Sequence, residues 1–194
     1  MKRTSSTAFA AAEKVSSAKK SRQASVPTAL HPPDDTLYIY TDGSDFKHAL
    51  NRTIGGGAVF VHHYATATRG WTFNRAEILE KFHLSKDFPG SFSNPTAEML
   101  AAANALEIAI EMKKGLNIKH IVLLADYNQV FLYATRTYKR PQFLPSKRAT
   151  FIYQHAVCTF LDMLAGAKKA GFTVDVRHIK GHSGDKYNDL ADAI

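Results

Sequence analysis

Cysteine and long apolar runs are scarce in this chain, and each scarcity excludes a class of protein. The 194 residues include one cysteine, Cys158, which excludes an internal disulfide and fits a reducing compartment. Its apolar neighbours indicate a packed thiol and not a nucleophile. The longest apolar stretch, residues 97–110, is interrupted by Asn104 and Glu107 and is too short to span a membrane. We therefore expect a soluble intracellular protein, with nucleus, cytoplasm and mitochondrion all open.

Acidic residues are nearly absent from residues 1–30, which hold six Lys and Arg against Glu13 alone and so carry +5 of the net +8. This segment is rich in Ala, Ser and Lys and has no strand or core pattern, so we expect a disordered basic leader. It resembles a mitochondrial transit peptide, while residues 19–22 fit a nuclear signal or a phosphate contact equally well. Residues 31–194 are long enough for one folded domain.

The order of predicted elements in residues 31–194 is typical of a mixed α/β sheet. Three short strands are expected first, one ending at Asp42, one over 58–61 after the glycines 55–57, and one within 71–84, as an antiparallel meander. Asn94 as N-cap and Pro95 predict the start of a long helix that Gly115 ends. The elements expected after it are a strand at 121–124, helices at 128–135 and 149–170, a strand at 173–179 and a helical start at 188–194. We therefore predict a mixed α/β fold: a five-stranded sheet with three antiparallel strands, then crossover strands, flanked by helices.

Four acidic residues fall at the ends of these elements. Asp42 ends the first strand, Glu98 lies in the first turn of the long helix, Asp126 follows the fourth strand, and Asp192 lies in the last helical segment. Each has an ordinary explanation, such as an Asx turn with Gly43 at positive φ, a helix-dipole contact, a helix cap or a solvated acid.

Taken together, the acids point to a metal site. The first and fourth strands are predicted neighbours, which brings Asp42 beside Asp126 and within reach of Glu98. Close like charges repel unless a cation neutralises them, and carboxylate oxygens select hard ions such as Mg²⁺ or Mn²⁺ over zinc. Two such ions can activate water and stabilise the leaving oxygen of a phosphodiester.

Four motifs carry a family resemblance. They are Tyr40-Thr-Asp42-Gly-Ser44, then Asn94-Pro-Thr-Ala-Glu98, then Leu-Leu-Ala-Asp126-Tyr-Asn-Gln-Val, and finally Ile-Lys-Gly-His182-Ser-Gly-Asp-Lys-Tyr-Asn188-Asp-Leu-Ala-Asp192. In order and spacing they resemble type 1 ribonuclease H over about residues 37–194, and the last motif is the most specific. The basic stretch 136–148 lies where several members of that family carry a substrate-binding protrusion.

The resemblance implies a monomeric endoribonuclease that hydrolyses the RNA strand of RNA–DNA hybrids with two Mg²⁺ or Mn²⁺ ions. The implied metal ligands are four carboxylates: Asp42, Glu98, Asp126 and Asp192. His182 matches a histidine that assists proton transfer or product release. The implied substrate contacts, some of them to RNA 2′-hydroxyls, are Gly43, Ser44, Asn94 and Asn188.

The sequence departs from the family pattern without removing a carboxylate. Ala125 stands where Thr is usual, Tyr127 where Ser is common, and Thr96 where a basic residue is common. Thr96 is expected to weaken substrate contact.

Two other acids compete with the implied ligands. Residues 74–77 mimic the glutamate motif but lack a long Ala-rich helix leading into the strand before Asp126, so Glu98 is preferred over Glu77. The sequence stops two residues after Asp192, so its helix is expected to be barely begun, and Asp189 is the alternative ligand.

Other functions stay open beside the leading one. A non-catalytic nucleic-acid-binding or assembly module would have the same fold, and a related nuclease or transposase would group acids on a similar sheet. The single acid of the Asp42 motif argues against an exonuclease, and the Gly-His182-Ser-Gly loop against a transposase. Both a cellular enzyme and a retroelement or viral domain fit the sequence.

Three further histidines have no zinc-ligand spacing and are interpreted as structural or surface residues: His62, His63 and His178.

Overall fold

The computed structural model describes residues 35–46, 53–63, 65–86, 92–113, 115–141 and 151–194. The predicted leader over residues 1–30 lies outside these ranges. Within them, no helix combines the length and apolar character needed to cross a membrane.

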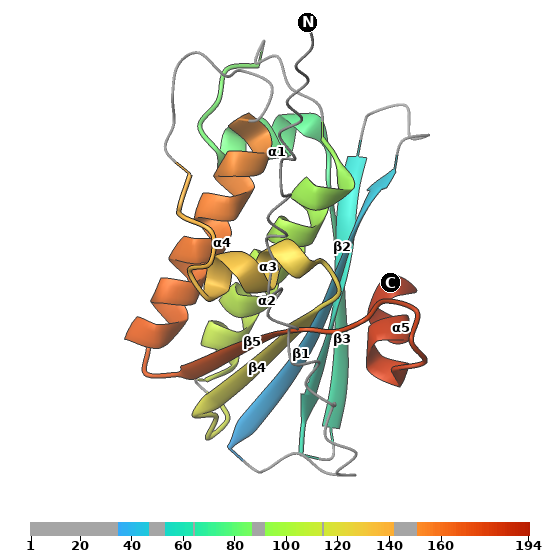
Figure 1. The fold of residues 1–194 in the computed structure, drawn as a ribbon, viewed down its shortest axis with the longest axis vertical. Coiled ribbons are helices and arrows are strands. Elements are labelled where there is room, and N and C mark those ends of the chain that lie inside the picture. Colours follow the sequence, from blue (N-terminus) through green and yellow to red (C-terminus); the bar gives the residue numbers. More distant parts are fainter. Residues whose placement is uncertain (1–34, 47–52, 64, 87–91, 114, 142–150) are drawn as a thin grey trace, which may run out of the picture.

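Five strands form one mixed sheet in the order β3-β2-β1-β4-β5 (Figure 1). The antiparallel meander consists of β1 (Thr36–Phe46), β2 (Thr53–His62) and β3 (Ala65–Phe73). The crossover strands β4 (His120–Ala125) and β5 (Thr173–His178) extend it in parallel beyond β1. The predicted fold class is confirmed, including the neighbouring positions of the first and fourth strands.

Helices cover both faces of this sheet. The helices α2 (Asn94–Met112) and α4 (Phe151–Lys169) pack together on one face, and α3 (Asn128–Ala134) follows β4. On the other face, α5 (Lys186–Asp192) contacts β1 and β2. The first helix, α1 (Arg75–Lys81), joins β3 to α2.

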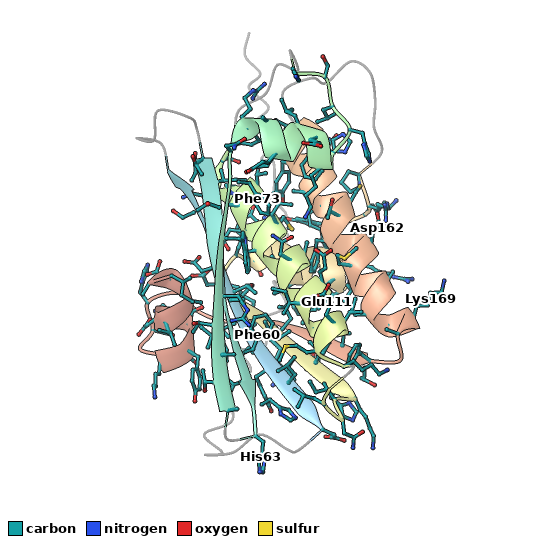
Figure 2. All side chains as sticks on the ribbon, turned by 180° about the vertical axis from the view of Figure 1, so that it is seen from behind. Phe60, His63, Phe73, Glu111, Asp162 and Lys169 are labelled. Carbon is teal, nitrogen blue, oxygen red and sulfur yellow. The ribbon has the colours of Figure 1, made fainter. Side chains whose placement is uncertain are left out.

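The alternation of side chains along β1 builds a core on each face. Leu37 and Ile39 point into the main core beneath α2, to which β2 contributes Phe60 (Figure 2). Tyr40 points into a smaller core that contains Ala191 of α5. The small alanine side chains of α2 allow its backbone to lie close to the sheet, which matters for the site below.

The predicted third strand is wrong in position. The strand is Ala65–Phe73, and half of the segment 71–84 forms α1 instead. The Thr-rich β3 is exposed along most of its length, so it lacks the apolar alternation that identifies a strand. A capping box starts α1: Asn74 Oδ1 accepts from the Glu77 amide, and Glu77 Oε2 accepts from the Asn74 amide.

Three local predictions around the acids are also wrong. Asp42 does not end the first strand, because β1 stays paired with β2 as far as Phe46. Gly43 has no positive φ, so the Asx-turn reading fails. The cap of α2 is Ser93 and not Asn94, and Glu98 therefore falls just beyond the first helical turn.

Candidate active site

Parallel pairing of β1 with β4 brings Asp42 and Asp126 together. The last pair of that ladder is Thr41 with Ala125, so each acid is the next residue after a member of that pair. Beyond this pair β1 continues beside β2 alone, while the chain after β4 turns into α3. The two carboxylates therefore lie at the point where the central strands separate.

The long helix delivers Glu98 to the same point through a close approach at Gly43. A Cβ at Gly43 would lie 2.3 Å from the carbonyl carbon of Ala97 and from the amide nitrogen of Glu98. No side chain fits there without moving backbone, so the glycine allows α2 to lie directly on β1. The Gly43 amide donates to Asp42 Oδ1 over 2.9 Å.

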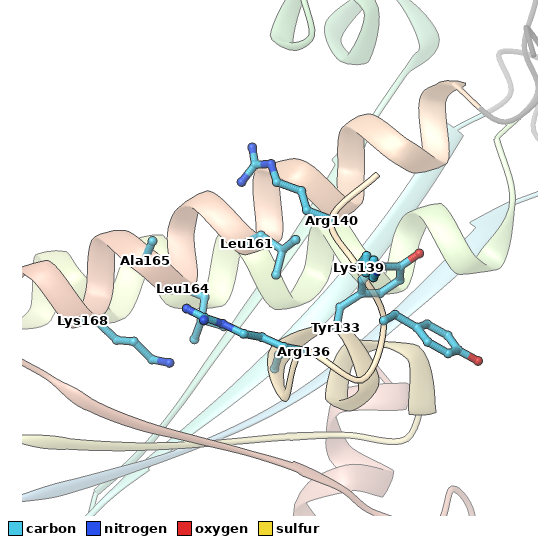
Figure 3. A pocket seen from close by; sticks show the side chains of 10 residues that line it. Tyr133, Arg136, Lys139, Arg140, Leu161, Leu164, Ala165 and Lys168 are labelled. Carbon is cyan, nitrogen blue, oxygen red and sulfur yellow. The ribbon is translucent and has the colours of Figure 1, made fainter. Parts of the chain in front are cut away.

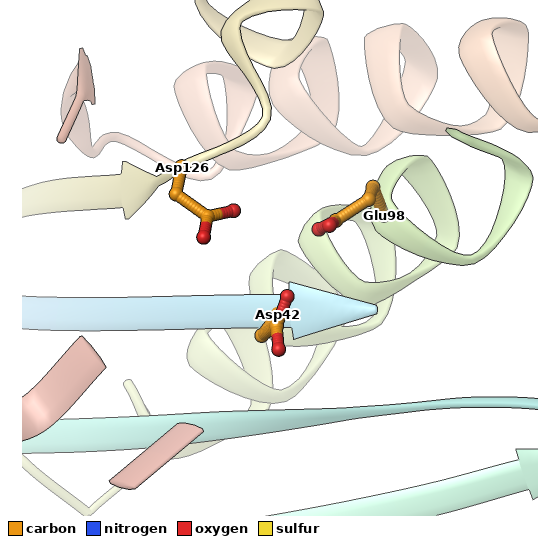
Figure 4. A group of neighbouring side chains, drawn as sticks. All are labelled: Asp42, Glu98 and Asp126. Atoms are coloured by element: carbon orange, nitrogen blue, oxygen red, sulfur yellow. The ribbon is translucent and has the colours of Figure 1, made fainter. Parts of the chain in front are cut away.

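Asp42, Glu98 and Asp126 form what we call the acidic cluster. One oxygen of each carboxylate lies within 4.8 Å of one from each of the others, and the three side chains face a common space (Figure 4). All three are partly buried. Glu98 Oε2 is buried and has no hydrogen-bond partner.

Burial and mutual repulsion favour protonated forms in the acidic cluster. Burial, then the contact with Asp192 and the charge of Asp126, raise the pKa of Asp42 to about 6. Burial and the negative charges of Asp42 and Asp126 raise the pKa of Glu98 to about 10. Burial also raises the pKa of Asp126, although a hydrogen bond from Asn188 opposes the shift. Without a cation, the cluster retains protons at neutral pH.

These features fit a hard divalent cation. The donors are carboxylate oxygens alone, which suit Mg²⁺ or Mn²⁺ better than zinc. The unpartnered Glu98 oxygen is a buried acceptor that a cation would satisfy. The pKa values of Asp42 and Glu98 are raised first by burial and then by neighbouring negative charges, and a bound cation would offset both effects.

Asp192 reaches the cluster from the opposite face of the sheet. Its carboxyl hydrogen-bonds with that of Asp42, and Asp192 Oδ2 lies 3.8 Å from His182 Nδ1. Asp189 is exposed on the same helix, and no contact between it and the acidic cluster occurs among the described residues. The geometry therefore favours Asp192 over its alternative.

The helix α5 is more complete than expected, because it starts at Lys186. Asp185 caps it by accepting from the amides of Tyr187 and Asn188. At its other end, a Cβ at Gly57 would lie 2.6 Å from the Ala191 carbonyl oxygen. Gly57 is the register partner of Asp42, so α5 rests on β2 directly beside that acid.

The loop before α5 lies against Asp126. A Cβ at Gly181 would be 2.6 Å from Asp126 Oδ2, which places the backbone next to the carboxylate. The following residue, His182, has φ 50° and a side chain that is 82% exposed. His178 Nε2 lies 2.9 Å from the Asp126 backbone oxygen, which agrees with a structural role for that histidine.

The predicted substrate residues differ in their surroundings. Ser44 and Asn94 are exposed, whereas Gly43 and Asn188 are buried. Asn94 Oδ1 accepts from the Asp45 amide over 2.9 Å, which ties α2 to the end of β1. Asn188 hydrogen-bonds with Asp126, and its Oδ1 has no hydrogen-bond partner. No sequence pattern indicates the contact of Asn188 with Asp126, because only the fold brings these two residues together.

Glu77, the acid that competes with Glu98 in the sequence, has a structural role. Glu77 is half of the capping box of α1, and its carboxylate oxygen is bonded to the Asn74 amide at 2.8 Å. His62 pairs with Leu37 at the start of β1, far along the strand from Asp42.

Comparison with known proteins gives the family. The sequence profile of RNase H matches residues 34–194, which is most of the chain. No curated protein sequence matches this chain. RNase H1 from the halophilic archaeon Halobacterium salinarum NRC-1 has a similar structure, with a TM-score of 0.52, 20% identity, and 81% of this chain and 92% of that chain covered.

Two further solved structures are similar. The N-terminal RNase H domain of rv2228c from Mycobacterium tuberculosis has a TM-score of 0.52 and 15% identity, covering 80% of this chain and 95% of that one. LC11-RNase H1, isolated from compost, has a TM-score of 0.50 and 15% identity, covering 82% and 91%. Such identities show a shared fold, and the profile match over residues 34–194 shows that the chain belongs to the RNase H family of enzymes.

Proposed function

We propose that this protein hydrolyses the RNA strand of RNA–DNA hybrids with two divalent ions, Mg²⁺ or Mn²⁺. The observation that supports the proposal is the acidic cluster. Its three carboxylates converge, and one of their oxygens, Glu98 Oε2, is buried and has no hydrogen-bond partner. Asp192 contacts Asp42 and supplies a fourth carboxylate. The ligands in this proposal are Asp42, Glu98, Asp126 and Asp192.

Bound divalent ions supply an activated water and stabilise the negative charge on the leaving oxygen. The chain itself provides the geometry for this chemistry. The backbone at Gly43 lies against the backbone of Ala97 and Glu98, and that at Gly181 lies against the Asp126 carboxylate, so the positions of Glu98 and Asp126 are set by packing. Little side-chain rearrangement is then needed when substrate arrives.

His182 is assigned a role in proton transfer or product release. Its ring is 82% exposed and lies 3.8 Å from Asp192, so it can exchange protons with solvent while staying beside the carboxylates. A group of this kind must reach both the site and bulk water.

Recognition of the RNA strand is assigned to the edge of the site formed by β1 and the start of α2. Ser44 and Asn94 are exposed there, and the hydrogen bond from the Asp45 amide to Asn94 holds them in one surface. Polar groups at this edge can contact the 2′-hydroxyl that distinguishes RNA from DNA. Asn188 is buried, and it is proposed to act on substrate indirectly, through its hydrogen bond with Asp126.

The proposal is tested by incubating the full chain with Mg²⁺ and a labelled RNA–DNA hybrid. We expect cleavage of the RNA strand alone, none in chelator, and none of duplex RNA or duplex DNA. Binding of the hybrid without cleavage would favour the non-catalytic module instead.

A further inference from the structure

The surface on which α2 lies extends from β1 to β3 and carries a cross-strand row of three residues. Gly43 of β1 pairs with Gly56 of β2, and Gly56 pairs with Trp71 of β3. We call these three residues the Gly43 row. They are separate from the pocket of about 440 Å³ on α4, which lies at the basic stretch that the family resemblance already links to substrate (Figure 3).

The two glycines of the Gly43 row let α2 approach the sheet. Gly43 allows the helix to lie on β1, as described above, and Gly56 does the same on β2. A Cβ at Gly56 would lie 3.1 Å from Ala101 Cβ and 2.7 Å from the Asp42 backbone oxygen. The Ala101 side chain therefore occupies the space next to the bare backbone of Gly56.

Trp71 supplies the large side chain that the two glycines lack. Its Nε1 lies 3.2 Å from the position that a Gly56 Cβ would take, so the indole and Ala101 Cβ border the same point beside Gly56. The indole is partly buried and packs against the main core. A rigid aromatic ring with two rotatable bonds limits the movement of α2 across the glycines more than a smaller side chain would.

Ala101 connects this contact with the acidic cluster. It lies three residues after Glu98 in the continuous helix α2, and side chains at this spacing are neighbours on a helix surface. A shift of α2 at Ala101 therefore moves Glu98 as well. Asp42 and Asp126 follow paired residues of the central strands and would stay in place, so the shift changes the distances from Glu98 to both.

We propose that Trp71 is a positioning residue of the active site, which keeps α2 in its place on the Gly43 row and thereby sets the position of Glu98 in the acidic cluster. Trp71 acts through the helix and is not itself a ligand. As far as metal binding is concerned, this role rests on the function proposed above.

The test compares Trp71→Leu with Phe172→Leu in the full chain. Phe172 is buried at the other end of α2, where Lys113 Nζ lies 4.7 Å from the centre of its ring, so each change removes an aromatic ring beside this helix. Calorimetric titration should show about tenfold weaker Mn²⁺ binding in Trp71→Leu, as is typical for residues that orient metal ligands, and a change within about twofold in Phe172→Leu. Trp71→Phe keeps a ring in the Gly43 row and should recover most of the affinity.

A background without the Glu98 carboxylate separates positioning from general destabilisation. In Glu98→Gln, the addition of Trp71→Leu should weaken Mn²⁺ binding little further, because both changes act through the same carboxylate. Fully additive losses, or an equal loss of affinity in Phe172→Leu, overturn the proposal.

Crystal structures without metal test the role of Trp71 independently of the proposed function. If the unmodified chain binds no Mn²⁺, the proposed function fails, while the position of Glu98 can still be measured. In Trp71→Leu, the Glu98 carboxylate should move relative to Asp42 and Asp126 by more than about 0.5 Å, the tolerance of a functional site. In Phe172→Leu it should stay in place. An unmoved Glu98 in Trp71→Leu overturns the proposal.

Discussion

The two sides of the active site are built differently. Asp42, Glu98 and Asp126 come from two central strands and a 19-residue helix, and they are partly buried. Asp192 and His182 come from a seven-residue helix and a loop, with side chains 51% and 82% exposed. The sheet fixes the first side, while the second depends on how α5 rests on β2. Substitutions in the acidic cluster should therefore abolish cleavage, whereas substitutions of Asp192 or His182 should only reduce it.

The largest effect is expected from Asp126→Asn. Loss of one carboxylate from the acidic cluster should slow hybrid cleavage by about three orders of magnitude, because several kcal/mol of charge stabilisation depend on the ligands. Single-turnover cleavage with Mg²⁺ measures it. Asp162→Asn is the matched control, since its ion pair with Arg140 is exposed and outside the cluster. Activity of Asp126→Asn within threefold of the unmodified protein contradicts the assignment.

His182→Ala should slow turnover by about a hundredfold, which is typical of a lost proton-transfer group. The affinity for Mn²⁺, measured by calorimetry, should stay the same because His182 is not a ligand in our proposal. A large loss of metal affinity would assign the histidine to the metal site instead.

Gly57→Ala tests the packing of α5 against β2. The new Cβ would lie 2.6 Å from the Ala191 oxygen, so the helix must move. We expect cleavage to fall about tenfold, since overpacking of this kind costs about 1–3 kcal/mol. Gly115→Ala, where nothing lies within 4 Å, is the control.

A double substitution separates positioning of Asp192 from general destabilisation. In an Asp192→Asn background, Gly57→Ala should cost little further activity, because both changes act through the same carboxylate. Fully additive losses would show that Gly57 acts elsewhere.

The smallest effect is a pH dependence of stability without metal. The pKa values of Asp42 and Glu98, about 6 and about 10, lie above those of free carboxyls, so the folded chain binds more protons than the unfolded chain. Stability should therefore fall as pH rises from 5 to 8. Thermal unfolding in chelator measures this slope, and Glu98→Gln should flatten it. Added Mg²⁺ should stabilise the folded chain more at pH 8 than at pH 5. An unchanged slope of stability against pH in Glu98→Gln would show that Glu98 does not have a raised pKa.

The sequence predicts the elements that carry strong patterns. The apolar run before Asp126 and the Ala-rich stretch after Asn94 identify β4 and α2, and the fold follows from their order. The strand β3 could not be placed, because an exposed edge strand has little apolar alternation. Residues 74–77 carry both the capping box of α1 and a mimic of the glutamate motif, and the sequence pattern alone does not separate the two roles.

The site was predictable as a set of residues and not as a geometry. The spacing of motifs indicated which carboxylates belong together. It did not indicate that Gly43 is required by the backbone of α2, or that Asn188 bonds to Asp126, because both contacts arise from packing between distant segments. A run of three glycines at 55–57 reads as a turn, while the structure uses it inside a strand.

The bond from the Gly43 amide to Asp42 Oδ1 gives the site a built-in spectroscopic reporter. That proton senses the charge on the central carboxylate directly, so its NMR chemical shift should change when Asp42 takes up a proton or a metal ion. Titration of a ¹⁵N-labelled sample would then follow occupancy of the site at a single backbone position, with no substrate present.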